Sequence, residues 1–298
     1  MNYKVHYPYI TFIIHSPISI EDFFHTFHLS KKTIHLLKQN KDYTVNKRFV
    51  SSSTILLKGD HFSVKAFQEN DQLYPPQYED IDIIYEDEFL LVVNKPPFLS
   101  VFPDNLSHTD SLANRVSAYY QQCGYNIPVR YIHRLDYETT GLTLFCKCSF
   151  IQPLMDYQLS IKEIQRKYLA IVKGKLTGYK QHSPIGRDRH HNQRMIVSSS
   201  GKRACTYYQC IATNQDLSVV ECTLDTGRKH QIRVHMSAIG HPLLGDCLYG
   251  EKSHLMNRQA LHAFQLIFTH PITKEKMTLI CHPPVDMKNI MHSIDPIL

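Results

Sequence analysis

Strand-like segments dominate the chain after about residue 80, and they do not alternate regularly with helices. Five of them are rich in β-branched and aromatic residues: FLLVVNKP, GLTLFCK, YLAIVKG, SVVECTLD and MTLICHPP. The helix-like segments are fewer: HTDSLANRVSAYYQQCG, PLMDYQLSIKEI and RKHQIRVHMSAIG. A parallel sheet needs a crossover connection, usually a helix, between its strands. The pattern therefore predicts an α+β fold with a mixed, mainly antiparallel central sheet and flanking helices.

A smaller unit precedes these strands, from about residue 18 to 67. Its first half, SIEDFFHTFHLSKKTIHLLKQN, predicts two short helices with Ser19 and Ser30 as N-caps. Its second half, YTVNKRFV and TILLKGDHFSVKAF, alternates as strands do and contains tight turns. Acidic and polar residues with Pro75-Pro76 then predict a linker. We expect four segments: an N-terminal extension (1–17), a small α/β domain (18–67), a linker (68–80) and a large domain (81–298).

Basic residues are concentrated on the small unit. The formal net charge of the whole chain is +6 at pH 7, which favours polyanionic partners without establishing one. Residues 18–67 resemble the S-four-type RNA-binding domain in the lysine-led second helix, the strand–turn–strand around Asn46 and the LLKGDHFSV strand. Asn46-Lys47 stands where the usual turn is Asn-Gly. A solvated basic face is the alternative to RNA binding. The candidate RNA contacts are Lys31, Lys32, Lys38, Lys47 and Arg48.

Composition disfavours several classes of protein. No run of apolar residues approaches the length of a membrane span. The first residues lack the charged, apolar and cleavage regions of a signal peptide. The eight cysteines include no Cys-x-x-Cys pair, which argues against a zinc ribbon and for buried, reduced thiols. We therefore expect a cytoplasmic protein without a membrane segment.

The segment YIHRLDYETTGL, residues 131–142, raises a question about its one central carboxylate. Asp136 lies two residues after Arg134 and just before the Thr139-Thr140-Gly141 turn. Aspartates often accept hydrogen bonds from turn amides, so Asp136 could be a structural cap. It could instead be a chemical group that the turn displays. Taken alone, this segment favours the cap.

Five blocks in order make the chain similar to the RluA-type pseudouridine synthases, over about residues 80–286. They are YEDEFLLVVNKPPFLSVFP, YIHRLDYETTGLTLFCK, QRKYLAIVKG, LDTGRKHQIRVHMSAIGHPLLGDCLYG and ALHAFQLIFTHP. Members of this family convert selected uridines in RNA to pseudouridine by detaching the uracil, turning it and reattaching it through carbon 5. The resemblance implies the pseudouridine synthase fold for residues 81–298.

The resemblance also implies roles for three residues. Asp136 matches the catalytic aspartate, which could attack the sugar, stabilise its cationic character or assist removal of its 2′ proton. Arg233 matches the arginine that pairs with this carboxylate, keeping it ionised and aimed. Tyr168 matches the tyrosine that contacts the target base and is a candidate for proton removal. A surface arginine and a half-buried core tyrosine are the structural alternatives.

Further basic residues are candidates for RNA contact. Arg134 matches the arginine that enters the RNA stack when the target nucleotide is extruded, and a salt bridge to Asp136 is its alternative role. Lys95, Lys202 and Arg228 are candidates for phosphate contact. Two departures from the family pattern are Thr140 for the usual serine and Phe102 where many members have histidine. Neither removes a catalytic group.

The reaction is an isomerisation, so the resemblance implies neither a redox cofactor nor a metal, and the chain has no Gly-rich phosphate loop. RNA is the expected partner, with ribosomal RNA of the large subunit preferred and transfer RNA possible, and we expect a monomer. Two other classes compete: a non-catalytic RNA-binding or ribosome-assembly protein, and a sugar-cleaving hydrolase. The hydrolase usually needs two carboxylates flanking the bond, and Glu138 has no supporting context.

Overall fold

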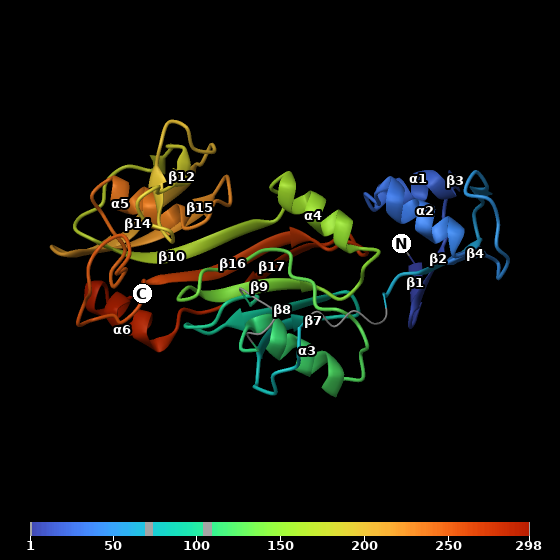
Figure 1. Cartoon of the computed structure of the whole chain (residues 1–298), viewed down its shortest axis with the longest axis horizontal. Helices are drawn as coiled ribbons and strands as arrows, with labels where there is room; N and C mark the ends of the chain where they lie inside the picture. Colours follow the sequence, from blue (N-terminus) through green and yellow to red (C-terminus); the bar gives the residue numbers. More distant parts are fainter. Residues whose placement is uncertain (1, 69–73, 104–108, 298) are drawn as a thin grey trace.

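A nine-stranded sheet forms the centre of the large domain in the computed structural model, which describes residues 2–68, 74–103 and 109–297 (Figure 1). Its strand order is β11-β14-β15-β10-β16-β9-β8-β7, and β17 also pairs with β16. Within the described residues, every pairing in this sheet is antiparallel except that of β9 with β16. The predicted fold class is therefore confirmed. The strands are β7 (Asp82–Glu86), β8 (Leu90–Lys95), β9 (Thr140–Cys146), β10 (Gln165–Lys173), β11 (Lys180–Gln181), β14 (Thr206–Thr213), β15 (Leu217–Leu224), β16 (Leu261–Thr269) and β17 (Lys276–Ile280).

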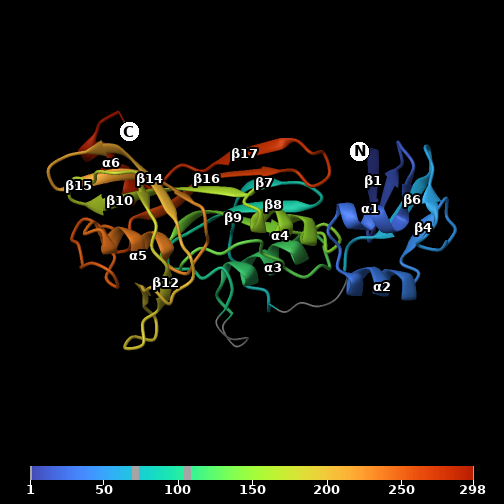
Figure 2. The ribbon, with the colours of Figure 1, turned by 90° about the horizontal axis from the view of Figure 1, so that it is seen from above.

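Helices cover both faces of this sheet. The helices are α3 (Leu112–Gln122), α4 (Gln152–Ser160), α5 (Gln231–Ala238) and α6 (Val285–Ile294), and Figure 2 shows α3, α4 and α5 on one side. Side chains alternate across β10: Tyr168 shares a core with Ile232 of α5, whereas Ile171 packs with Met287 of α6. Opposite faces of one strand therefore contact different helices. The sequence indicated α3, α4 and α5 but not α6.

The helix expected over residues 229–239 begins later than predicted, at Gln231. His230 precedes it with a φ of +57°, in the left-handed region, which cannot be part of a right-handed helix. A short two-stranded hairpin, β12 (Ile185–Arg187) with β13 (Met195–Val197), lies beside α5 (Figure 1). We call residues 185–197 the basic hairpin, because Arg187 at the end of β12 and Arg189 with two histidines in the loop are exposed.

The N-terminal part has the two predicted helices, α1 (Ile20–Thr26) and α2 (Lys31–Gln39), with the Ser19 and Ser30 hydroxyls accepting from backbone amides as N-caps. A four-stranded sheet in the order β1-β2-β6-β4 packs against them. Two of its strands come from residues expected as an extension, because β2 pairs with β6. The domain boundaries themselves stay a prediction, and residues 69–73 of the expected linker lie outside the described residues. The strands are β1 (Asn2–His6), β2 (Tyr9–Ile13), β4 (Tyr43–Val45) and β6 (His61–Lys65), with β3 (Ile18–Ser19) and β5 (Ile55–Leu56) paired separately.

The turn at Asn46-Lys47 keeps its hairpin geometry without the usual glycine. Val45 and Arg48 exchange both backbone hydrogen bonds, and the two residues between them have φ values of +49° and +68°. Positive φ at both central positions is what a type I′ turn requires. Asn46 is stabilised by its side chain, which donates to Asp60 and accepts from the His61 amide. These two hydrogen bonds hold Asn46 in the left-handed region, and Lys47 takes positive φ at the position where glycine is usual.

The N-terminal part is joined to the large domain by a continuous apolar core. Phe150 lies 4.7 Å from Phe27 and 6.2 Å from Phe24 between ring centroids. The Ala66 carbonyl accepts hydrogen bonds from the Phe150 amide and the Ser149 hydroxyl.

None of the helices in the described part of the chain has the combination of length and apolar character that crossing a bilayer requires. All eight cysteines are free, and five are buried.

Candidate active site

The turn that carries Asp136 is held by its neighbours and not by the Asp136 carboxylate. The Asp136 carbonyl accepts from the Thr139 amide at 3.0 Å. The Thr139 hydroxyl accepts from Gln259, and the Thr140 hydroxyl bonds His262 of β16 at 2.8 Å. Among the described residues, only Arg233 donates to the Asp136 side chain, which is 18% exposed. The carboxylate is therefore not the cap of its turn, and it remains open to a substrate.

Gly141 allows β9 to pack closely beside β16. Its φ is +112°, and a Cβ at this position would lie 2.3 Å from the Ala263 carbonyl oxygen. A side chain cannot fit at that distance, so glycine is needed for the parallel pairing of Gly141 with Ala263. This close approach is what holds the Asp136 turn at the end of β16.

Arg233 of α5 is shared unequally between two carboxylates. Its Nε and Nη2 donate to Asp246 at 2.7 and 2.9 Å, a bidentate pair in which Asp246 is fully buried. Its Nη1 reaches Asp136 at 3.5 Å. Asp246 also accepts from the Leu248 and Tyr249 amides. The expected pairing of Arg233 with Asp136 exists, but Asp246 is what fixes the guanidinium.

His230 approaches the other oxygen of Asp136. Its Nε2 lies 4.0 Å from Asp136 Oδ1, and its Nδ1 lies 2.8 Å from the Tyr249 hydroxyl. Burial lowers the pKa of His230 to about 4; Asp136 opposes this shift and Arg233 adds to it. The imidazole is therefore neutral near pH 7, and Asp136 faces one cation and one neutral ring.

Tyr168 lines a small cavity of about 120 Å³ together with Asp136 and Arg233. This volume is several times the roughly 10–15 Å³ that one water molecule needs, so the cavity has room for a small planar ring such as a pyrimidine. Burial raises the pKa of the Tyr168 phenol, Arg166 lowers it and Asp136 raises it. The phenol is therefore protonated near neutral pH. The three residues expected to be catalytic lie together around one base-sized space.

Asp136 also borders a second, larger space. A groove of about 860 Å³ is lined by Arg134, Asp136 and Gln193 of the basic hairpin, among others. The Arg134 guanidinium lies 5.1 Å from the Phe102 ring, which stacks on Tyr131 with centroids 4.9 Å apart. No ion pair joins Arg134 to Asp136 within the described part of the chain, so the alternative role expected for Arg134 is not seen. Asp136 thus lies where an open groove meets a small pocket.

Lys95 does not reach the surface. It is fully buried, and its Nζ donates to the carbonyls of Pro96, Leu99 and Tyr137. Burial lowers its pKa to about 7, and Asp136 opposes this shift. A phosphate contact needs exposure, so the role expected for Lys95 does not fit its position. Its hydrogen bond to the Tyr137 carbonyl instead links the end of β8 to the Asp136 turn.

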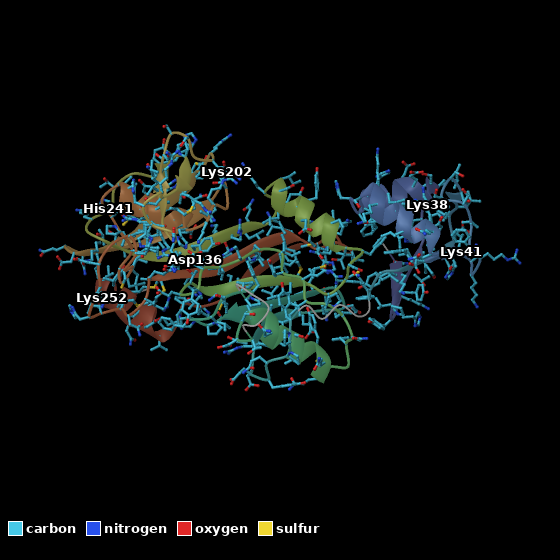
Figure 3. The ribbon with its side chains drawn as sticks, in the orientation of Figure 1. Lys38, Lys41, Asp136, Lys202, His241 and Lys252 are labelled. Atoms are coloured by element: carbon cyan, nitrogen blue, oxygen red, sulfur yellow. The ribbon has the colours of Figure 1, made fainter. Side chains whose placement is uncertain are left out.

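The remaining expected RNA contacts lie in two separate places, and all of them except Lys38 are exposed; Lys38 is half-buried and lies 3.8 Å from Glu21. Arg228 lines the base-sized cavity, and Lys202 lies on the same half of the molecule. Figure 3 shows Lys38 at the opposite end of the molecule from both Lys202 and Asp136. Lys31, Lys32, Lys47 and Arg48 are also exposed in that N-terminal part. The structure therefore brings the catalytic candidates together and leaves the N-terminal lysines apart from them.

Two residues at the site were not predicted, Asp246 and His230. Both belong to the block LDTGRKHQIRVHMSAIGHPLLGDCLYG, so the motif contained them. The signal for Asp246 is that a buried arginine needs an acidic partner, so a buried Arg233 predicts an acid beside it. Sequence spacing alone does not show that Asp246 returns to Arg233. The described residues contain no group of three or more histidine, cysteine or acidic side chains placed to hold a metal ion.

Comparisons with known proteins agree with this geometry. The mainly antiparallel sheet displays the Asp136 carboxylate where a small pocket meets a groove. The family model described as RNA pseudouridylate synthase matches residues 89–238, and that of the RluD ribosomal pseudouridine synthase N-terminal domain matches residues 10–62. The chain belongs to the RNA pseudouridylate synthase family, and it is an RNA pseudouridine synthase, an isomerase.

Individual relatives cover most of the chain. An uncharacterized RNA pseudouridine synthase, YhcT of Bacillus subtilis (strain 168), is 41% identical over 265 residues, which are 88% of each chain. Ribosomal large subunit pseudouridine synthase D of Nitrosomonas europaea is 36% identical over 79% of this chain and 72% of its own. The solved human RNA pseudouridylate synthase domain containing 1 has a TM-score of 0.59 and 25% identity, over 74% of this chain and 89% of that one.

Proposed function

We propose that this enzyme isomerises uridines in large-subunit ribosomal RNA and that Asp136 is its reacting carboxylate. The observation that carries the assignment of Asp136 is its contrast with Asp246. Asp246 is fully buried and accepts four hydrogen bonds, whereas Asp136 accepts one and borders both the pocket and the groove. A carboxylate that must meet a sugar carbon needs unoccupied oxygens.

The geometry supports a division of labour during the reaction. A stacked nucleotide hides its sugar–base bond, so the target has to leave the stack at a cost of a few kcal/mol. Arg134 lies on the groove side of Asp136 and presents a planar cation that can occupy the vacated space. The extruded uracil would enter the cavity beside Tyr168, which places the anomeric carbon near Asp136.

In the chemical step, the bond from the anomeric carbon to N1 breaks and a bond from that carbon to C5 forms. The proton on C5 is lost, and N1 ends with a hydrogen. We propose that Asp136 acts at the anomeric carbon and that Arg233 holds it in place. Tyr168 keeps its phenolic proton because burial raises its pKa. We propose that it contacts the base from the wall of the cavity.

The choice of ribosomal RNA depends on relatives and on charge. Relatives at 34–37% identity are named ribosomal large subunit pseudouridine synthase D. The N-terminal part resembles the RluD N-terminal domain and carries exposed lysines suited to a structured RNA. We also propose that the enzyme acts as a monomer, and work on ribosomal RNA would place it in the cytoplasm.

Primer extension after carbodiimide treatment tests this function, because pseudouridine has the same mass as uridine but retains the carbodiimide adduct. Unmodified large-subunit ribosomal RNA and total transfer RNA transcripts would each be incubated with the protein. We expect new stops in ribosomal RNA only. Stops confined to transfer RNA would overturn the substrate, and no stops in either RNA would overturn the proposal as a whole. Mapping pseudouridines in a strain that lacks the protein would then identify the position.

A further inference from the structure

Tyr249 lies between the basic hairpin and the two groups that face Asp136. Its side chain is buried, and its hydroxyl accepts a hydrogen bond from the Met195 amide of β13 at 2.8 Å. The same hydroxyl lies 2.8 Å from His230 Nδ1. Its ring lies 5.0 Å from the Arg233 guanidinium and 5.5 Å from that of Arg194 in the hairpin. One side chain therefore contacts both the hairpin and the site.

The hydrogen bonds of Tyr249 define which nitrogen of His230 carries the proton. The phenol has one proton to donate, and the Met195 amide already uses an oxygen lone pair. A buried hydroxyl donor needs an acceptor, and His230 Nδ1 is the one that the described residues provide. Because Nδ1 accepts, the proton of the neutral imidazole lies on Nε2. That N–H is the group 4.0 Å from Asp136 Oδ1.

The position of His230 suits a neutral donor to the carboxylate. The backbone of His230 has positive φ, which fixes the direction in which its side chain leaves the chain just before α5. Arg233 approaches Oδ2 of Asp136 and His230 approaches Oδ1, so the two oxygens meet different groups. At 4.0 Å the N–H is just outside hydrogen-bonding distance. A small movement of His230 would complete the contact.

We propose that Tyr249 is a positioning residue that couples the basic hairpin to Asp136 through His230. In this proposal, the exposed arginines of the hairpin contact RNA. A change in the position of the hairpin moves the Met195 amide and, through its hydrogen bond, the Tyr249 hydroxyl. The movement of Tyr249 brings His230 into position to donate to Asp136. This inference rests on the proposed function and adds to it a link between RNA docking and the chemical step. Figure 2 shows the hairpin projecting on the side of the sheet where α5 lies, which agrees with such a link.

Single-turnover kinetics with saturating enzyme test the link, because they measure the chemical step separately from RNA affinity. The variants are Tyr249→Phe, which removes only the hydroxyl, His230→Asn, which a left-handed backbone tolerates, and the double variant. Tyr120→Phe is the matched control, because Tyr120 is fully buried and its hydroxyl has no hydrogen-bond partner among the described residues.

We expect Tyr249→Phe to lower the single-turnover rate constant about tenfold while the dissociation constant for RNA changes less than about twofold. His230→Asn should lower the rate constant at least as much, and the double variant should be no slower than His230→Asn alone. Tyr120→Phe should match the wild type. If Tyr249→Phe also matches the wild type, or if the two substitutions multiply, Tyr249 does not act through His230. An inactive wild type would instead overturn the proposed function.

Discussion

At the scale of single residues, two aspartates near one arginine have opposite environments. Asp246 is fully buried and saturated with donors, and Asp136 is partly exposed with one donor at 3.5 Å. A buried carboxylate with complete hydrogen bonding is held in place by low-dielectric interactions. An open carboxylate has oxygens left for a substrate. The site therefore uses one acid to fix Arg233 and offers the other for chemistry.

Replacing Asp246 tests this distinction. Asp246→Asn removes the charge that fixes Arg233, and breaking a buried ion pair costs about 3–5 kcal/mol of stability. We expect the free energy of unfolding to fall by about that amount or somewhat less, and kcat to fall at least tenfold. Urea unfolding and single-turnover assays would measure the two effects.

Asp286→Asn is the control, because Asp286 also forms a bidentate pair with a buried arginine, Arg258, and does not contact Asp136, although its own side chain is 38% exposed. It should lower stability and leave kcat within about threefold of the wild type. If Asp246→Asn behaves in the same way as Asp286→Asn, Asp246 serves stability alone.

At the scale of elements, two backbone features place the reacting groups. The parallel contact of β9 with β16 holds the Asp136 turn, and the left-handed His230 sets where α5 begins. Neither feature depends on the catalytic side chains. Both depend on backbone conformations that few residue types adopt, glycine at position 141 and a residue able to take positive φ at position 230.

Gly141→Ala tests the first of these features. The added Cβ would meet the Ala263 carbonyl at 2.3 Å, so β9 and β16 would have to separate. We expect a loss of about 3 kcal/mol or more in unfolding free energy and loss of activity. Gly124→Ala is the control, because its φ is also positive but nothing lies within 4 Å. It should cost roughly 1–2 kcal/mol. Equal losses from both would show that backbone strain, and not the close strand contact, is what matters.

At the scale of the whole molecule, the N-terminal lysines that we propose as RNA contacts lie at the opposite end from Asp136. The N-terminal part is fixed to the large domain through Phe150 and the Ala66 carbonyl, and its lysines face solvent far from Asp136. Removing this part would expose the Phe150 ring, so an effect of the deletion on RNA binding could not be separated from its effect on folding. Surface substitutions are the better way to separate the two.

Lys31→Ala with Lys32→Ala should weaken RNA binding without slowing the chemical step. Each lost phosphate contact reduces the slope of log affinity against log salt by about 0.7–0.9, so the slope should fall by about 1.5. The single-turnover rate constant at saturating enzyme should not change. Filter binding over a series of salt concentrations would measure the slope. Lys252→Ala with Lys276→Ala, two exposed lysines of the large domain, is the control. An equal effect from the control would argue against a specific role for α2.

Stability should fall steeply under mild acid because of three buried histidines. Burial lowers the pKa of His133 to about 3 and the pKa values of His230 and His262 to about 4. In the unfolded chain these groups take up protons near pH 6.5, so the unfolded state binds more protons between pH 6.5 and 4. Their contribution to stability is therefore full above pH 6.5 and is lost as pH falls toward 4, by about 1.4 kcal/mol per pH unit for each histidine. Urea midpoints that stay level between pH 7.5 and 5 would contradict this.

Much of the fold could be predicted from periodicity and capping residues. Ser19 and Ser30 cap helices as their position suggested, and the strand-like segments form the expected antiparallel sheet. The resemblance pointed to Asp136, Tyr168 and Arg233, which border one cavity in the structure, and their catalytic roles stay a prediction. The burial of Lys95 could not be predicted, because a lysine beside a loop is usually exposed. Nor could the roles of Asp246, which depends on where a loop returns after α5, and of His230, which depends on the left-handed backbone just before α5.

The most direct measurement of the central claim is the rate of pseudouridine formation by Asp136→Asn on the RNA that the wild type modifies. Asparagine keeps the shape of the side chain and removes the charge that acts at the anomeric carbon. RNA binding by this variant, measured by filter binding, should equal that of the wild type. Carbodiimide stops should appear with the wild type and be absent with Asp136→Asn, even at saturating enzyme and long incubation. Stops of equal strength with both proteins would contradict the assignment of Asp136 as the reacting carboxylate.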